Sequence, residues 1–254
     1  MSDIAKMYAS VSPINANTHG DVSIKPVTNL GFSRGINSIP VVAAEFLSAA
    51  QDMAIVFTGD EDAMVPVALT GVKPNENVYL DKDGKWTGRY VPAFLRRYPF
   101  IFARSDADTM TLCLDEAYTG INRDGRGERL FDVDGNRTQY LDNMLGFVTQ
   151  YQRQHIVTQA FCKRLATLGL LEPATLNASD ADGETRRLVG FQVINRQKFK
   201  AIPDADLLAM FRSDELELCY LHMHSLQNLG IQLANAQASA PAQGLAEPDA
   251  IETM

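Results

Sequence analysis

The sequence lacks the long hydrophobic runs that membrane insertion requires. No window approaches the roughly eighteen consecutive apolar residues of a transmembrane helix. The N-terminal stretch, residues 1–21, also lacks the continuous apolar segment of a signal peptide. Only three cysteines are present, and their odd number and wide spacing exclude a disulfide framework and a paired metal-binding motif: Cys113, Cys162 and Cys219. We therefore expect a cytoplasmic protein in a reducing compartment, without integral membrane insertion.

Positive charge is also scarce. The chain of 254 residues carries a formal net charge of -8. Nucleic acids and anionic membrane surfaces attract proteins through an excess of Lys and Arg. The charge balance therefore predicts that no nucleic acid is a partner.

Recognisable catalytic motifs are missing as well. The sequence contains no GxSxG, HExxH, GxxxxGK[ST] or GxGxxG pattern. No catalytic residue and no cofactor is predicted, and whether the chain is an enzyme stays open. An active site could still form from acid and base groups that lie far apart in the sequence.

What is present indicates a folded α+β protein. Hydrophobic residues make up 46% and charged residues 21%, as in ordinary folded domains. We expect a strand-rich first half with short helices and a helix-rich second half containing a small β element. We expect a loose arm at 1–20, one domain at 21–236 with an alternative sub-boundary near 120–136, and a disordered tail at 237–254.

The first half is rich in short apolar runs and turn residues. Pro40 after a capping Ser38 predicts a helix to Asp52, and Asp83-Gly84 predicts a hairpin turn. Pro92 can open a helical turn that Pro99 closes. Five or six short strands and two helices are predicted over residues 20–118, with strands at Val22–Val27, Ala54–Gly59, Met64–Gly71, Pro99–Ala103 and Met110–Asp115.

The second half has a helical pattern. From Asn136 to Leu170 the chain has no proline and few glycines, and apolar residues recur at helical spacing. This predicts one long helix that ends near Gly169, with these apolar residues: Leu141, Leu145, Val148, Ile156, Phe161 and Leu165. A polar turn at Ala178–Glu184, a strand in LVGFQVINRQKF and two C-terminal helices, the longer one beginning at Ser213, complete the prediction.

Two motifs resemble metal sites. FDVDGN begins like a calcium loop but lacks the distal bidentate Glu, so FDVDGN and DKDGK are both interpreted as Asp-Gly turns. In CYLHMH, Cys219 and His222 lie three residues apart on a predicted helix, while His222 and His224 do not share a face. Without a second ligand pair we interpret this as an ordinary packed or surface helix and predict no metal.

The most distinctive segment is YVPAFLRRYPF, which holds two prolines, two adjacent arginines and four aromatic residues. A helical turn would point Arg96 and Arg97 to different sides, and guanidinium groups bind carboxylates, phosphates or aromatic faces. The candidate ligand-binding residues are Tyr90, Arg96, Arg97 and Tyr98. The alternative is structural: an arginine pairs with an acid while the aromatic rings fill the core.

Several segments, in order, resemble the bacterial SapC family. These are GINSIPVVAAEFLSAAQDMAIVFTG, VALTGVKPNENVYLDKDGKWTGRYVPAFLRRYPFIF, LFDVDGN and LVGFQVINRQKF, within roughly residues 11–232. The resemblance implies an association with bacterial surface-layer loci and with neighbouring genes for outer-membrane receptors and tryptophan-halogenase-like enzymes. It supplies no catalytic residues, and the histidines of CYLHMH depart from the usual apolar-polar ending.

Three functional hypotheses follow from this resemblance and the missing motifs. The first is a non-enzymatic accessory or binding protein of a bacterial surface-layer or nutrient-acquisition system, acting with a protein partner. The second is a small-molecule enzyme component that assists a neighbouring flavin-dependent, tryptophan-halogenase-like enzyme, with Arg96, Arg97 and Tyr98 binding an anionic substrate. A deep polar pocket lined by both arginines would favour it. The third is a self-assembling surface-layer element, which would be a homo-oligomer.

Overall fold

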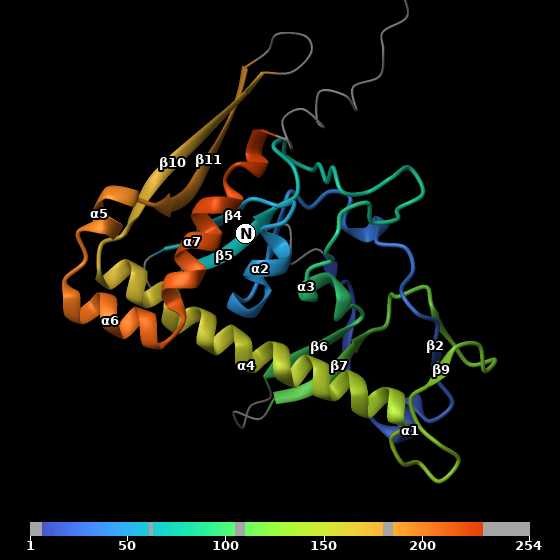
Figure 1. The fold of residues 1–254 in the computed structure, drawn as a ribbon. Helices are drawn as coiled ribbons and strands as arrows, with labels where there is room; N and C mark the ends of the chain where they lie inside the picture. Colours follow the sequence, from blue (N-terminus) through green and yellow to red (C-terminus); the bar gives the residue numbers. More distant parts are fainter. Residues whose placement is uncertain (1–6, 61–62, 105–109, 180–184, 231–254) are drawn as a thin grey trace, which may run out of the picture.

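The computed structural model describes residues 7–60, 63–104, 110–179 and 185–230. A five-stranded antiparallel sheet lies beside the C-terminal helices (Figure 1). Its central strands are the apolar runs IVFT and VPVAL, which are predominantly buried and rich in the β-branched residues that suit a packed sheet. Its strand order is β10 (Leu171–Ser179), β11 (Thr185–Ile194), β4 (Ile55–Thr58), β5 (Val65–Leu69), β3 (Ser38–Pro40).

Two smaller antiparallel sheets form the other end of the molecule. The first has the order β1 (Val11–Pro13), β7 (Met110–Asp115), β6 (Phe100–Arg104), and the second β8 (Ile121–Asn122), β2 (Ser23–Ile24), β9 (Glu128–Arg129). Part of the predicted loose arm is thus built into the fold as β1 and the short helix α1 (Ala16–His19).

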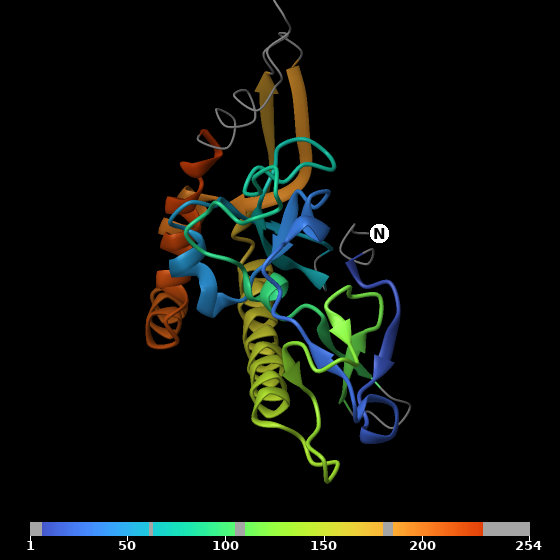
Figure 2. The same ribbon diagram turned by 90° about the vertical axis from the view of Figure 1, so that its right-hand side faces the viewer.

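One long helix, α4 (Gln139–Thr167), runs alongside both parts of the molecule, as the two views show (Figures 1 and 2). Thr138 caps it, because its side chain accepts a hydrogen bond from Leu141 N. Its first half packs beside β6, and the helix also contacts β5 of the larger sheet. The predicted long helix is confirmed. Not all of its regularly spaced apolar residues are buried: Leu145 is half-buried and Ile156 is 59% exposed.

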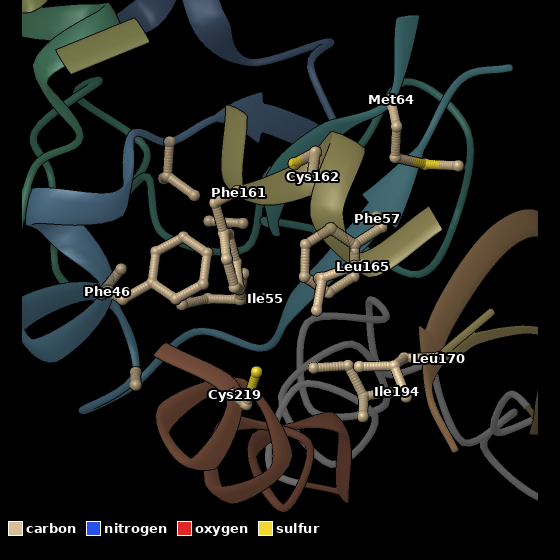
Figure 3. Close-up of a cluster of buried hydrophobic side chains, with 14 of the residues drawn as sticks. Phe46, Ile55, Phe57, Met64, Phe161, Cys162, Leu165, Leu170, Ile194 and Cys219 are labelled. Carbon is tan, nitrogen blue, oxygen red and sulfur yellow. The ribbon is translucent and has the colours of Figure 1, made fainter. Parts of the chain in front are cut away.

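The largest part of the core lies between the five-stranded sheet, α4 and the helices α2 (Phe46–Ala49) and α7 (Glu215–Ser225). Figure 3 shows Phe46, Phe57 and Phe161 meeting there from three elements. Ring centroids lie 6.2 Å apart for Phe46 and Phe161 and 6.3 Å for Phe57 and Phe161. Such aromatic contacts add directional packing to the burial of apolar area.

Most local predictions in the first half are confirmed. Strands occupy the predicted runs around Ile55, Val65, Phe100 and Met110, although the predicted strand Val22–Val27 shortens to β2. Gly84 has a φ of 78° in its turn. Each Asp-Gly turn is held by an aspartate that precedes its glycine. Oδ1 of Asp81 accepts two backbone N–H hydrogen bonds in the DKDGK turn, and Oδ1 of Asp132 accepts two in the FDVDGN turn.

The predicted helix from Pro40 to Asp52, capped by Ser38, is wrong. Ser38 and Pro40 belong to β3, which pairs with β5, so the pairing overrides the capping pattern. Helical structure begins later, as the 3₁₀ helix η3 (Ala43–Glu45) followed by α2. At the start of η3, the backbone N–H of Val42 donates a hydrogen bond to the Glu45 side chain at 2.9 Å. Glu45 thus takes the capping role that the sequence assigned to Ser38.

The β element of the second half is larger than predicted. Strand β10, which contains Pro173, was not predicted, and together with β11 it forms a long hairpin that projects from the body (Figure 1). A mixed α and β fold with a helical C-terminal part is confirmed at this coarser level. The predicted polar turn lies mostly in 180–184, outside the described residues, as does the predicted tail at 237–254.

The C-terminal helices are α5 (Arg196–Lys200), α6 (Asp204–Arg212) and α7. Ser213, predicted to begin the last helix, instead follows α6, and its hydroxyl donates to Ala209 O at 3.1 Å. Asp214 has a φ of 60° and reverses the direction of the chain. Helix α7 can therefore pack back against α6. None of the helices in the described part of the chain is long and apolar enough to cross a membrane.

Candidate functional site

The segment Tyr90 to Phe100 folds around a short helix, α3 (Ala93–Arg96), as the two prolines predict. The buried carboxylate of Glu45 holds the start of this helix. Its Oε1 accepts hydrogen bonds from Ala93 N at 2.6 Å and from the Tyr90 hydroxyl at 2.7 Å. Burial, together with the negative charge of Glu45, raises the pKa of Tyr90 to about 12. This tyrosine therefore stays protonated and serves as a fixed donor.

Tyr98 is a core residue with a polar anchor. Its hydroxyl donates to Asp115 Oδ2 at 3.3 Å, and its ring packs 4.4 Å from the Phe32 ring. Burial and the charge of Asp115 raise the pKa of Tyr98. The Asp115 carboxylate also accepts hydrogen bonds from Ala9 N and Ser10 N. These bonds attach the N-terminal segment to the end of β7.

Arg96 lies on the outer side of α3. Its Nε donates to Val91 O at 2.9 Å and one terminal nitrogen donates to the Tyr90 hydroxyl at 3.0 Å. Its guanidinium lies 5.2 Å from the centre of the Phe147 ring. With Tyr98 and Trp86 it lines a cavity of about 380 Å³, which we call the Arg96 cavity.

Arg97 points to a different cavity. Its guanidinium lies 4.3 Å from the Phe94 ring centre and 4.9 Å from that of Tyr151. Its Nε is buried and meets no acceptor among the described residues, and none of their carboxylates lies at ion-pair distance. The guanidinium also hydrogen-bonds the Tyr8 side chain, and its charge offsets part of the rise that burial causes in the pKa of Tyr8.

The cavity that Arg97 lines, here called the Arg97 cavity, has a volume of about 230 Å³. Helix α4 forms one wall with its residues 151, 152, 155, 158 and 159, which share a face because they lie about one helical turn apart. Burial, reinforced by the charge of Arg97, lowers the pKa of His155, so its imidazole is neutral near pH 7. The remaining lining is mostly apolar: Pro40, Val41, Met64, Val65, Pro66 and Phe94.

The four predicted residues are thus divided between two places. Tyr90 contacts Arg96, and Arg96 shares its cavity with Tyr98, whereas Arg97 faces away. The two arginines do not line one deep polar pocket, and neither forms a described ion pair with an acid. Sequence reasoning missed the α4 wall, although Gln152, His155 and Gln159 are polar residues at helical spacing, a pattern that could have indicated it.

The Arg97 cavity presents a guanidinium, an imidazole and amide groups to a bound molecule. Its described lining contains no Cys, Ser, Lys, Asp or Glu. The hydroxyl of Thr158 already donates to Gln154 O at 2.7 Å and accepts Ala43 N at 2.8 Å. The guanidinium offers planar, paired N–H donors, which match a carboxylate.

The CYLHMH segment lies on α7, and its Cys219 and His222 side chains are buried in the core. The Nδ1 of His222 donates to Ile55 O at 2.9 Å, and its Nε2 accepts Ile194 N at 3.1 Å, so both ring nitrogens are used. Burial raises the pKa of Cys219 to about 12. No cluster of three or more His, Cys, Asp or Glu side chains that could hold a metal occurs in the described ranges.

Comparison with known proteins identifies a family. The family model described as SapC matches residues 14–231, which is most of the chain. Searches of curated proteins and of solved structures found no match.

Proposed function

For this chain, which belongs to the SapC family, we propose a non-enzymatic binding function in a bacterial surface-layer or nutrient-acquisition system. Its ligand is a small carboxylate held in the Arg97 cavity. The observation that carries the proposal is the half-buried guanidinium of Arg97, which faces this cavity without an acidic partner among the described residues.

The charge of the cavity favours a monoanion. Arg97 is the one residue with a fixed charge in the described lining, and the lowered pKa of His155 keeps a second positive charge away near pH 7. A doubly charged phosphate would leave one charge uncompensated in a half-buried site, which is costly. A carboxylate takes two parallel hydrogen bonds from one guanidinium.

The shape and lining favour a small ligand with an apolar body. A cavity of about 230 Å³ lies below the usual range for drug-sized ligands. Val41, Met64 and Pro66 offer apolar contact opposite the polar residues of α4. Ligands of the size of benzoate fit this description.

We predict that benzoate binds and that replacing Arg97 with Gln weakens its binding at least about tenfold, since hydrogen bonds to charged groups contribute about 1.5–3 kcal/mol. Isothermal titration calorimetry with benzoate measures this. Benzamide, which has the same shape without the charge, should bind more weakly. The matched control is Arg96→Gln, which changes the neighbouring arginine outside the cavity.

Equal affinities for benzoate and benzamide, or unchanged affinity in a folded Arg97→Gln protein, would contradict this site. Mass spectrometry of the ligand after incubation tests the non-enzymatic part, because a turned-over product counts against it. A pull-down from the native host tests the accessory role through the recovered partner.

A separate observation favours self-assembly as a second candidate function. Helices α6 and α7 expose four large apolar side chains, between 41% and 67% exposed: Leu207, Leu208, Phe211 and Tyr220. Exposed apolar surface of this kind often marks an interface. Asp206 and Arg212 lie toward opposite ends of α6, so two copies of the helix packed antiparallel would place unlike charges opposite each other.

We predict that the protein dimerises at rising concentration and that Phe211→Ser raises the dimer dissociation constant about tenfold, through loss of buried aromatic area. Sedimentation equilibrium measures the constant. The control is Val133→Ser, at a residue exposed to 88% on the FDVDGN turn. A wild-type protein that stays monomeric at every concentration would rule out this surface as a self-interface.

A further inference from the structure

A third hollow lies between α4 and the β1–β7–β6 sheet, and we call it the α4 groove. It has a volume of about 720 Å³ and is mainly apolar. Helix α4 contributes residues at spacings of three and four, which form one stripe along the helix. Its principal lining residues are Leu141, Leu145, Thr149, Gln152, Arg153 and Ile156 from α4, with Phe102, Met110 and Leu112 from the sheet.

The groove follows α4 for several turns. From Leu141 to Ile156 the helix rises about 22 Å, at about 1.5 Å per residue. A mainly apolar hollow along this length suits an extended hydrocarbon chain.

The two ends of the α4 groove differ in charge. Near Leu141, the guanidinium of Arg137 is already paired with Asp142 at 2.8 Å. Near Ile156, Arg153 is exposed and no described carboxylate pairs with it. The amide of Gln152 lines the groove beside it. Among the described residues, one end therefore carries a guanidinium without an acidic partner, and the rest offers apolar contact.

We infer that the α4 groove binds a long-chain fatty acid. The carboxylate lies against Arg153 and Gln152, and the hydrocarbon chain runs along α4 toward Leu141. Covering the side chains of the groove removes apolar surface from water, which favours binding in proportion to the area. The charged end fixes the direction of the chain. Gln152 lines both hollows, but the charged residues differ: Arg153 lines the α4 groove and Arg97 lines only the Arg97 cavity.

Titration of the full-length protein with cis-parinaric acid, a fluorescent fatty acid, tests the inference. We expect saturable binding at one site and displacement by palmitate. Arg153→Gln should weaken palmitate binding about tenfold while leaving the affinity for hexadecanol unchanged, because only the acid carries the charge. The matched control is Lys163→Gln, an exposed residue on the same helix, which should change neither.

Blocking the groove gives a second test. Leu145→Glu places a charge on its apolar wall and should abolish binding. Ile156→Glu places a charge at an exposed position of the groove, where a polar side chain should not disturb folding. It should weaken palmitate binding at least about tenfold, because the new carboxylate repels that of the ligand. Circular dichroism checks that both variants are folded.

Three outcomes would overturn the proposal: binding that does not saturate, unchanged affinity in both groove variants, or equal weakening of acid and alcohol by Arg153→Gln. Benzoate should not displace cis-parinaric acid, and Arg97→Gln should bind it normally. This proposal and that for the Arg97 cavity can therefore fail separately.

Discussion

Replacing Glu45 with alanine is expected to lower the free energy of unfolding by about 3 kcal/mol or more, since each buried donor left without an acceptor costs about 1–3 kcal/mol. The carboxylate is buried and accepts three hydrogen bonds, from Val42 N, Ala93 N and the Tyr90 hydroxyl. Alanine leaves all three donors without this acceptor, and buried donors without acceptors are costly. Urea unfolding followed by circular dichroism measures the change.

The network around Glu45 also positions the candidate site. It joins the start of η3 to the start of α3, segments about 45 residues apart in the sequence, and α3 leads directly into Arg97. Glu217→Ala is the control, because Glu217 is exposed and surface substitutions usually change stability by less than about 0.5 kcal/mol. A loss below about 1 kcal/mol for Glu45→Ala would show that the network contributes little to folding.

The sequence predicts those parts of this fold whose signals are local. Pro92 and Pro99 bound α3, the two Asp-Gly turns form around their aspartates, and Thr138 starts a helix whose long uninterrupted pattern marks its extent. Each of these features depends on backbone geometry within a few residues, so it can be recognised without knowledge of the partner elements.

Features that depend on distant partners were predicted less well. Ser38 precedes a good helix pattern, yet pairing with Leu69 places it in a strand. Leu171–Ser179 includes a proline that argues against a strand, but the hairpin with β11 accommodates it at the sheet edge. Long-range packing decided both cases.

The candidate site shows the same limit. The sequence singles out Arg96 and Arg97, but it does not show which cavity each guanidinium faces. That depends on where α4 lies relative to α3, since Tyr151 and His155 complete the wall around Arg97. The apolar stripe of α4 is similarly ambiguous, because Val148 is buried while Ile156, on the same helix, lines an open groove.

The second large effect is a loss of stability in mild acid, caused by His222. Burial lowers the pKa of His222 to about 4, against about 6.5 in the unfolded chain. Below pH 6.5 the unfolded chain binds a proton that the folded protein does not, so unfolding becomes more favourable as the pH falls. The loss develops between pH 6.5 and pH 4 and reaches about 3 kcal/mol, at about 1.36 kcal/mol per pKa unit.

The structural cause is that the neutral ring already uses both nitrogens. A proton on Nε2 would remove the acceptor of Ile194 N and place a positive charge between β4, β11 and α7. His222→Gln removes this titration, so its unfolding free energy, although lower at pH 7, should fall about 3 kcal/mol less between pH 7 and pH 4 than that of the wild type.

Comparison with His224→Gln isolates this contribution, because His224 lies two residues further along α7 and is exposed. Other groups, including His155, also titrate in this range, but they are present in all three proteins and cancel in the difference. If wild type and His222→Gln lose equal stability between pH 7 and pH 4, protonation of His222 does not drive acid unfolding. The bond to Ile55 O would then persist in the folded protein with a charged ring.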